Sequence, residues 1–169
     1  MQTALDLRSA LLQSGGCAFT AEINVDYGQT ALRFCTDCTY QTDGRTHLLI
    51  DSPETLAGIS AYTGEDGAKL RFSDTVAAMP LLDDGRISPL SFAYLLGSCL
   101  SQDYISCTGS DGGYSRITYL HGYDEDELTV DVFLDENAIP MLAEVSKDGQ
   151  LLLAAELRNF TDTYEPITE

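Results

Sequence analysis

The chain has 169 residues, of which 44% are hydrophobic, and this length and composition fit one globular domain with its own core. Its 27 acidic and 9 basic residues give a net charge of −18, which repels nucleic acid and anionic lipid headgroups and argues against both as direct partners. No apolar run approaches the roughly 20 residues that cross a bilayer, and the N-terminus lacks the basic and apolar regions of a signal peptide.

The first half of the chain predicts one helix followed by antiparallel strands. Residues 3–13 have a helical pattern, and Gly15 and Gly16 follow as a stop. Apolar residues then alternate with polar ones, and residues 17–26 and 32–40 predict a hairpin that turns at 27–29. Further strands are predicted at residues 45–51, 57–63 and 67–73.

The middle of the chain is predicted to be helical, and strands return after it. Ser73 and Asp74 can cap a short helical turn through residues 75–82. Ser88 and Pro89 begin a second helix. Its apolar stripe consists of Phe92, Ala93, Leu96, Cys99 and Leu100. The later strands are predicted at residues 103–108, 113–121, 127–134, 138–146 and 150–159.

This order of elements predicts an α+β fold built on one antiparallel sheet. The strands are joined by short turns, and too few helices remain to cover both faces of the sheet. A strongly curved sheet that closes around the central helix would bury the apolar face. Because no repeat, linker or low-complexity stretch divides the chain, residues 1–169 are expected to form a single domain.

Five cysteines favour an extracytoplasmic location over a cytosolic one. The Cys-x-x-Cys pair at residues 35–38 continues a strand pattern with no helix behind it, which favours a plain strand over a redox site. In one register of the first hairpin Cys17 faces Cys38, and the two could form a cross-strand disulfide. A turn shifted by one residue keeps the same faces but removes this direct pairing.

The sequence predicts no catalytic residue, metal site or cofactor. A second Cys-x-x-Cys or a closely spaced histidine pair is absent, and His47 and His121 lie far apart. Serine-hydrolase, metalloprotease and phosphate-loop motifs are also absent. A hydrolase would require a cleft with ionisable residues gathered around one of the two histidines.

The predicted strands carry more apolar residues than the one opening helix can cover. Taken singly, each is explained by ordinary core packing, but together they are expected to line the concave side of the sheet and to leave an apolar ligand cavity. The predicted lining, which includes two residues of the central helix, is Phe19, Ile23, Val25, Leu32, Phe34, Leu48, Ile50, Leu70, Phe72, Phe92, Leu96, Val130 and Val132.

Several segments in this order resemble the LolA-like lipoprotein carrier superfamily, particularly diverged lipoproteins of Gram-positive, spore-forming bacteria. They are FTAEINVDYG at 19–28, LRFCTDCTY at 32–40, ISPLSFAYLLGSCL at 87–100 and PMLAEVSKDGQLLLAAELRNF at 140–160. The resemblance implies an eleven-stranded incomplete β-barrel whose concave side is closed by helices around an apolar cavity. It also implies a strand arginine that helps to hold the lid, for which Arg33 is the nearest analogue by position.

The resemblance implies a non-enzymatic protein that binds an acyl chain, a lipoprotein or a hydrophobic peptide outside the cytoplasm. The alternative is an envelope or spore-associated interaction module with a filled core, which binds or regulates a partner such as a peptidoglycan enzyme. Relatives of this kind are tethered by a lipidated cysteine, and Cys17 lies too deep in the first strand to be that residue. Any membrane contact is therefore expected through an anchor that preceded residue 1 in the precursor.

Overall fold

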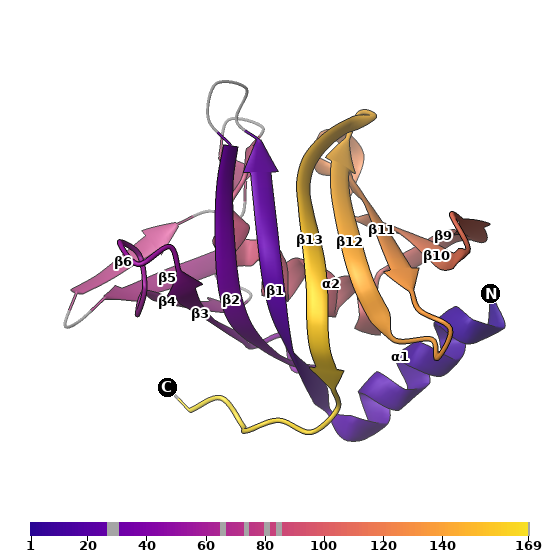
Figure 1. The fold of residues 1–169 in the computed structure, drawn as a ribbon, viewed down its shortest axis with the longest axis horizontal. Coiled ribbons are helices and arrows are strands. Elements are labelled where there is room, and N and C mark those ends of the chain that lie inside the picture. Colours follow the sequence, from indigo (N-terminus) through magenta and orange to yellow (C-terminus); the bar gives the residue numbers. More distant parts are fainter. Residues whose placement is uncertain (27–30, 65–66, 73–74, 80–81, 84–85, 169) are drawn as a thin grey trace.

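In the part of the chain that the structure describes, one curved sheet of eleven strands forms the framework and two α-helices lie against it (Figure 1). The computed structural model describes residues 1–168 apart from 27–30, 65–66, 73–74, 80–81 and 84–85, and for 64, 67–68, 72, 75–79, 82–83 and 86 it describes the backbone alone. The predicted turn at 27–29 therefore lies outside the described residues.

The strands follow one another along most of the sheet, and every described pairing is antiparallel. Their order is β6-β5-β4-β3-β2-β1-β13-β12-β11-β10-β9, so the first and last strands meet in the middle and β6 and β9 form the edges. The first six strands are β1 (Gly16–Asp26), β2 (Ala31–Gln41), β3 (Thr46–Ser52), β4 (Ser60–Gly64), β5 (Gly67–Phe72) and β6 (Thr75–Met79). The other five are β9 (Tyr104–Asp111), β10 (Tyr114–His121), β11 (Leu128–Leu134), β12 (Pro140–Lys147) and β13 (Gln150–Thr161). This open, curved sheet confirms the predicted fold class.

The central helix covers the concave face of the sheet. It begins with the 3-10 turn η1 (Pro89–Ser91), where the Ser88 hydroxyl accepts a hydrogen bond from Leu90 N, and continues as α2 (Phe92–Ser101). Nine of the ten residues of α2 are buried, and the helix contacts β2, β3 and β10 (Figure 1). The Phe92 ring meets Phe19 of β1 edge to face at 6.3 Å between centroids. The helix therefore fills the hollow of the sheet along its length.

A close contact sets the depth at which α2 lies. Gly97 of α2 packs against the ring of Tyr40 on β2, and a Cβ atom at this position would overlap that ring. The Tyr40 hydroxyl forms a 2.7 Å hydrogen bond with Ser101 Oγ, so the buried phenol keeps a polar partner. Burial raises the pKa of Tyr40.

The opening helix packs against α2 and β1. Helix α1 (Gln2–Ser14) ends at Gly15, whose left-handed backbone with φ of 80° closes the last turn, as the sequence predicts. Ala4 and Leu11 are its buried residues. Neither described α-helix combines the length and apolar character of a segment that crosses a membrane. The remaining short elements are η2 (Asp124–Asp126) and a two-stranded ribbon of β7 (Leu82–Asp83) and β8 (Arg86–Ile87).

One expectation about local structure was wrong, and the structure decides between two registers that the sequence left open. Residues 75–79 form strand β6, paired with β5, and not a helical turn, because a sheet partner supplies their backbone hydrogen bonds. In the first hairpin, Phe19 faces Cys38 and Cys17 faces Tyr40, which is the register shifted by one turn residue. Cys17 and Cys38 are accordingly free thiols and not a direct cross-strand pair.

Replacing Gly97 tests the contact that seats the helix. Gly97→Ala is expected to lower the free energy of unfolding by about 1 to 3 kcal/mol, because the added methyl group must displace the Tyr40 ring. Gly109→Ala on β9 is the matched control, since a Cβ there meets no atom within 4 Å. Urea denaturation of both variants measures the difference, and equal stabilities would contradict this packing.

Candidate functional site

The residues predicted to line a cavity lie mainly in the packed core. Leu70 is half-buried, Leu32 is 40% exposed, and the Phe72 side chain lies outside the description. The buried members are Phe19, Ile23, Val25, Phe34, Leu48, Ile50, Phe92, Leu96, Val130 and Val132. Because these buried side chains belong to one core cluster together with α2, a ligand among them would have to displace packed atoms.

A pocket of about 890 Å³ opens where α1, the end of α2, β9 and β10 meet. Its volume lies within the range of small-molecule sites, roughly 300 to 1,000 Å³. The larger apolar and aromatic side chains that line it are Met1, Leu5, Tyr94, Tyr104, Ile105, Leu120 and Tyr123. Its polar side chains are Arg8, Ser98, Gln102, Asp103, His121 and Glu127. Apolar walls with a few gathered polar groups are the usual composition of a binding site.

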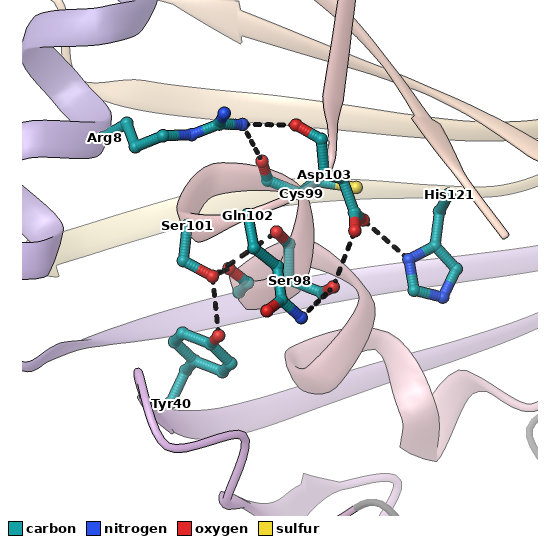
Figure 2. Close-up of polar contacts among 9 residues, drawn as sticks. Arg8, Tyr40, Ser98, Cys99, Ser101, Gln102, Asp103 and His121 are labelled. Atoms are coloured by element: carbon teal, nitrogen blue, oxygen red, sulfur yellow. Dashed lines mark hydrogen bonds and ion pairs between the residues drawn. The ribbon is translucent and has the colours of Figure 1, made fainter.

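The arginine that joins the two helices is Arg8 of α1. Its Nε donates to the carbonyl oxygen of Leu100 at 3.2 Å, and its Nη2 donates to those of Cys99 at 3.0 Å and Asp103 at 2.6 Å (Figure 2). Carbonyls at a helix C-terminus lack intrahelical partners, and a cation there also offsets the negative end of the helix dipole. Arg8 therefore completes the end of α2 and holds α1 against it.

Arg33, the analogue expected from the resemblance, does not make this contact. Its side chain is 69% exposed and forms a surface ion pair with Glu22, with Nε 3.3 Å from Oε1. Successive strand residues point to opposite faces, so Arg33 lies on the outer face while Phe34 is buried on the inner one. The lid-holding role of the resemblance therefore does not transfer to Arg33, because its position in the strand turns it away from the helices.

Asp103 is the centre of the polar floor of the pocket. One carboxylate oxygen accepts a hydrogen bond from Ser98 Oγ at 3.0 Å, and the other lies 2.6 Å from His121 Nδ1 (Figure 2). Gln102 Nε2 donates to Ser98 Oγ at 3.1 Å, and the Tyr94 ring meets the His121 ring edge to face at 6.2 Å. The end of α2 thus forms a chain of hydrogen bonds from Gln102 through Ser98 to Asp103, and Asp103 contacts His121 at the end of β10.

Ser98, Asp103 and His121 are not arranged as in a serine hydrolase. In a serine hydrolase the imidazole lies between serine and carboxylate, so that it can take the serine proton. Here the carboxylate lies between Ser98 and His121. The other histidine, His47, lies on β3 against Tyr62 at 4.7 Å between ring centroids, and burial lowers its pKa.

The Cys-x-x-Cys segment lies on a strand, as the sequence predicts. Cys35 is partly exposed, whereas Cys38 is buried, because residues three apart on a strand point to opposite faces. Burial raises the pKa of Cys38 to about 12, and burial together with the nearby Cys38 raises that of Cys17 to the same value. Both buried thiols are therefore protonated and unreactive at neutral pH.

Several solved structures resemble this one over nearly the whole chain, and one of them is a LolA superfamily protein. A LolA superfamily protein from Nitrosomonas europaea aligns over 98% of this chain and 94% of its own, with 10% identity and a TM-score of 0.54. An uncharacterised conserved protein from Thermus thermophilus covers 98% and 88%, with 10% identity and a TM-score of 0.52. A domain assigned to an outer membrane lipoprotein-sorting protein of Vibrio parahaemolyticus covers 95% and 90%, with 11% identity and a TM-score of 0.51.

These similarities lie in the fold and not in the sequence. No family model matches the chain, and no curated protein matches it significantly. The structural similarity nevertheless extends over nearly the whole chain, including both helices. The protein therefore has a LolA-like fold, as the resemblance implied.

Removing the guanidinium of Arg8 tests the joint between the helices. Arg8→Ala is expected to lower the free energy of unfolding by about 2 kcal/mol, because partly buried carbonyls lose a charged donor. Arg8→Lys should restore part of this loss, since an ammonium group supplies charge without the planar fork. Arg33→Ala is the control, with an expected change of at most about 0.5 kcal/mol for an exposed ion pair. A loss no larger for Arg8→Ala than for Arg33→Ala would contradict the role of Arg8.

Thiol alkylation tests the packing of the cysteines. In the native protein at mildly alkaline pH, iodoacetamide is expected to label the exposed Cys107 and to leave Cys17, Cys38 and Cys99 unmodified. Since thiolate is the reactive form, raising the pH toward 12 should increase labelling of Cys38. Peptide mass spectrometry with and without denaturant gives the rates. Labelling of Cys38 as fast as Cys107 would be inconsistent with its position on the inner face.

Proposed function

We propose that this protein is a non-catalytic binding protein of the bacterial cell envelope, and that its ligand is an acyl chain, a lipoprotein or another hydrophobic molecule. The observation that carries the proposal is the pocket of about 890 Å³ with aromatic and aliphatic walls, at one end of a LolA-like sheet. A LolA-like fold alone does not specify a ligand, so the site itself has to support one.

The proposal places ligand contact at the walls of this pocket. Tyr104 and Tyr123 are 69% and 87% exposed, and the less exposed Leu120 and Ile105 stand behind them. An acyl chain that covers such side chains gains roughly 0.8 kcal/mol for each CH₂ group it buries. The predicted concave residues would then serve as the rigid support beneath the pocket, because their own apolar surface is already buried.

The absence of catalysis and the extracytoplasmic location belong to the same proposal. The Ser98–Asp103–His121 order supports a binding role, since the serine hydroxyl donates to a carboxylate and has no imidazole beside it to take its proton. The LolA superfamily and lipoprotein-sorting names of the similar structures support an envelope location. We further infer that residues 1–169 act as one domain, held to the membrane in the precursor by a lipid anchor ahead of this segment.

The packing of α2 supports a second candidate function, an interaction module that binds a basic envelope protein through its outer surface. Nine of ten helix residues are buried, so the hollow along α2 is occupied by protein side chains. The net charge of −18 would attract a cationic partner. Binding of this kind weakens as salt shortens the Debye length, whereas uptake of a hydrophobic ligand does not.

A fluorescent palmitate analogue and a diacylated lipopeptide test the first function. The paired substitution Tyr104→Asp with Tyr123→Asp is expected to weaken binding of either probe by at least about tenfold, or roughly 1.4 kcal/mol, because it charges the open wall of the pocket. Tyr114→Asp is the matched control, since Tyr114 is 45% exposed and lies outside this pocket. If the unmodified protein binds neither probe, or if all variants bind equally, the pocket is not a hydrophobic-ligand site.

A further inference from the structure

Three side chains with metal-binding atoms meet at the floor of the pocket. Cys99, Asp103 and His121 each offer one such atom, and these atoms lie within 4.8 Å of one another. Cys99 is fully buried, and the side chains of Asp103 and His121 are 14% and 15% exposed. The cluster is therefore screened from bulk water, yet it borders a pocket through which an ion could enter.

The three donor types suit a transition-metal ion of intermediate softness. Thiolate, carboxylate and imidazole are the three ligand types that zinc accepts in proteins, and open zinc sites have three protein ligands and a water molecule. Bonds of about 2.0 to 2.3 Å place tetrahedral donors roughly 3.3 to 3.7 Å apart. Asp103 Oδ2 and His121 Nδ1 are 2.6 Å apart as a hydrogen-bonded pair, so replacing their shared proton by an ion requires a shift of about 1 Å.

An unpartnered hydroxyl group beside the cluster points to a missing ligand. Tyr119 of β10 is fully buried, and its hydroxyl oxygen has no hydrogen-bond partner among the described residues. Tyr119 and His121 are two residues apart on β10, so their side chains project from the same face of the strand. Because a buried hydroxyl group without a partner costs free energy, a metal-bound water near Tyr119 would supply what this site lacks.

The surrounding charges also favour a cation. Asp103 contributes a carboxylate to the cluster, and the protein as a whole has a net charge of −18. The guanidinium group of Arg8 is the opposing charge, and it is bound to three carbonyl oxygens at the end of α2.

We propose that Cys99, Asp103 and His121 form a site for one divalent transition ion, of which Zn²⁺ is the best match, with a water molecule as the fourth ligand. Ion binding displaces the proton of the Cys99 thiol to solvent and leaves the sulfur as a thiolate ligand. The site is separate from the proposed function, because a hydrophobic ligand would contact the pocket walls whether or not the floor holds an ion.

Cobalt binding tests the proposal on the intact chain. Co²⁺ added to the reduced, metal-stripped protein is expected to bind at one equivalent and to produce the near-ultraviolet charge-transfer absorption of a cobalt–thiolate bond. Zn²⁺ should displace the cobalt and abolish the band. Cys99→Ser should lose the charge-transfer band, and His121→Asn should bind Zn²⁺ at least about tenfold more weakly.

Matched controls separate a specific site from surface binding. Cys107→Ser removes an exposed thiol outside the cluster and should keep both the band and the affinity. Circular dichroism must show that every variant is folded, and His121→Asn serves if the buried Cys99→Ser substitution unfolds the protein. The proposal is overturned if the unmodified protein shows no cobalt–thiolate band at one equivalent, or if folded Cys99→Ser or His121→Asn variants bind as the unmodified protein does.

Discussion

The structure depends on burying one apolar helix in the hollow of a single curved sheet. A sheet with one apolar face is stable in water only when another layer covers that face. Helix α2 can serve as this cover because its sequence, FAYLLGSCLS, contains no charged residue. Gly97 lets its backbone approach the Tyr40 ring, and the Tyr40 hydroxyl reaches Ser101 one turn later. Depth and register of the helix are thus fixed by one small residue and one buried hydrogen bond.

The polar groups of the pocket floor gather where helix α2 ends. Within the helix, the backbone groups satisfy one another and the side chains are mostly apolar. At its C-terminus the backbone carbonyls lack helical hydrogen-bond partners, and the guanidinium group of Arg8 donates to them instead. The same segment directs Asp103 toward His121 (Figure 2). The end of α2 therefore forms the pocket floor. Helix α1 donates hydrogen bonds to this helix end and also forms part of the pocket wall.

Strand faces and the central helix could be predicted from the sequence because alternation and helical spacing are local signals. The hairpin register could be narrowed to two possibilities, since both keep Phe19 and Phe34 on the inner face and the turn decides between them. Residues 75–79 were misassigned because pairing with β5 outweighs local helix preference. The cluster of Cys99, Asp103 and His121 has no sequence motif, because its members come from a helix end and a distant strand that the curvature of the sheet brings together.

The edge strand β9 differs from the rest of the sheet in how little it contributes to the core. Apart from the partly buried Ile105, its residues are solvent-exposed, yet Tyr104 and Ile105 form part of the pocket wall. Detaching β9 from β10 would break one ladder of backbone hydrogen bonds, the contact of Ile105 with the core, and the hydrogen bond from the Met1 amino group to Thr108. Because β9 buries so little apolar surface, this edge is expected to open at a lower free energy than the whole molecule unfolds.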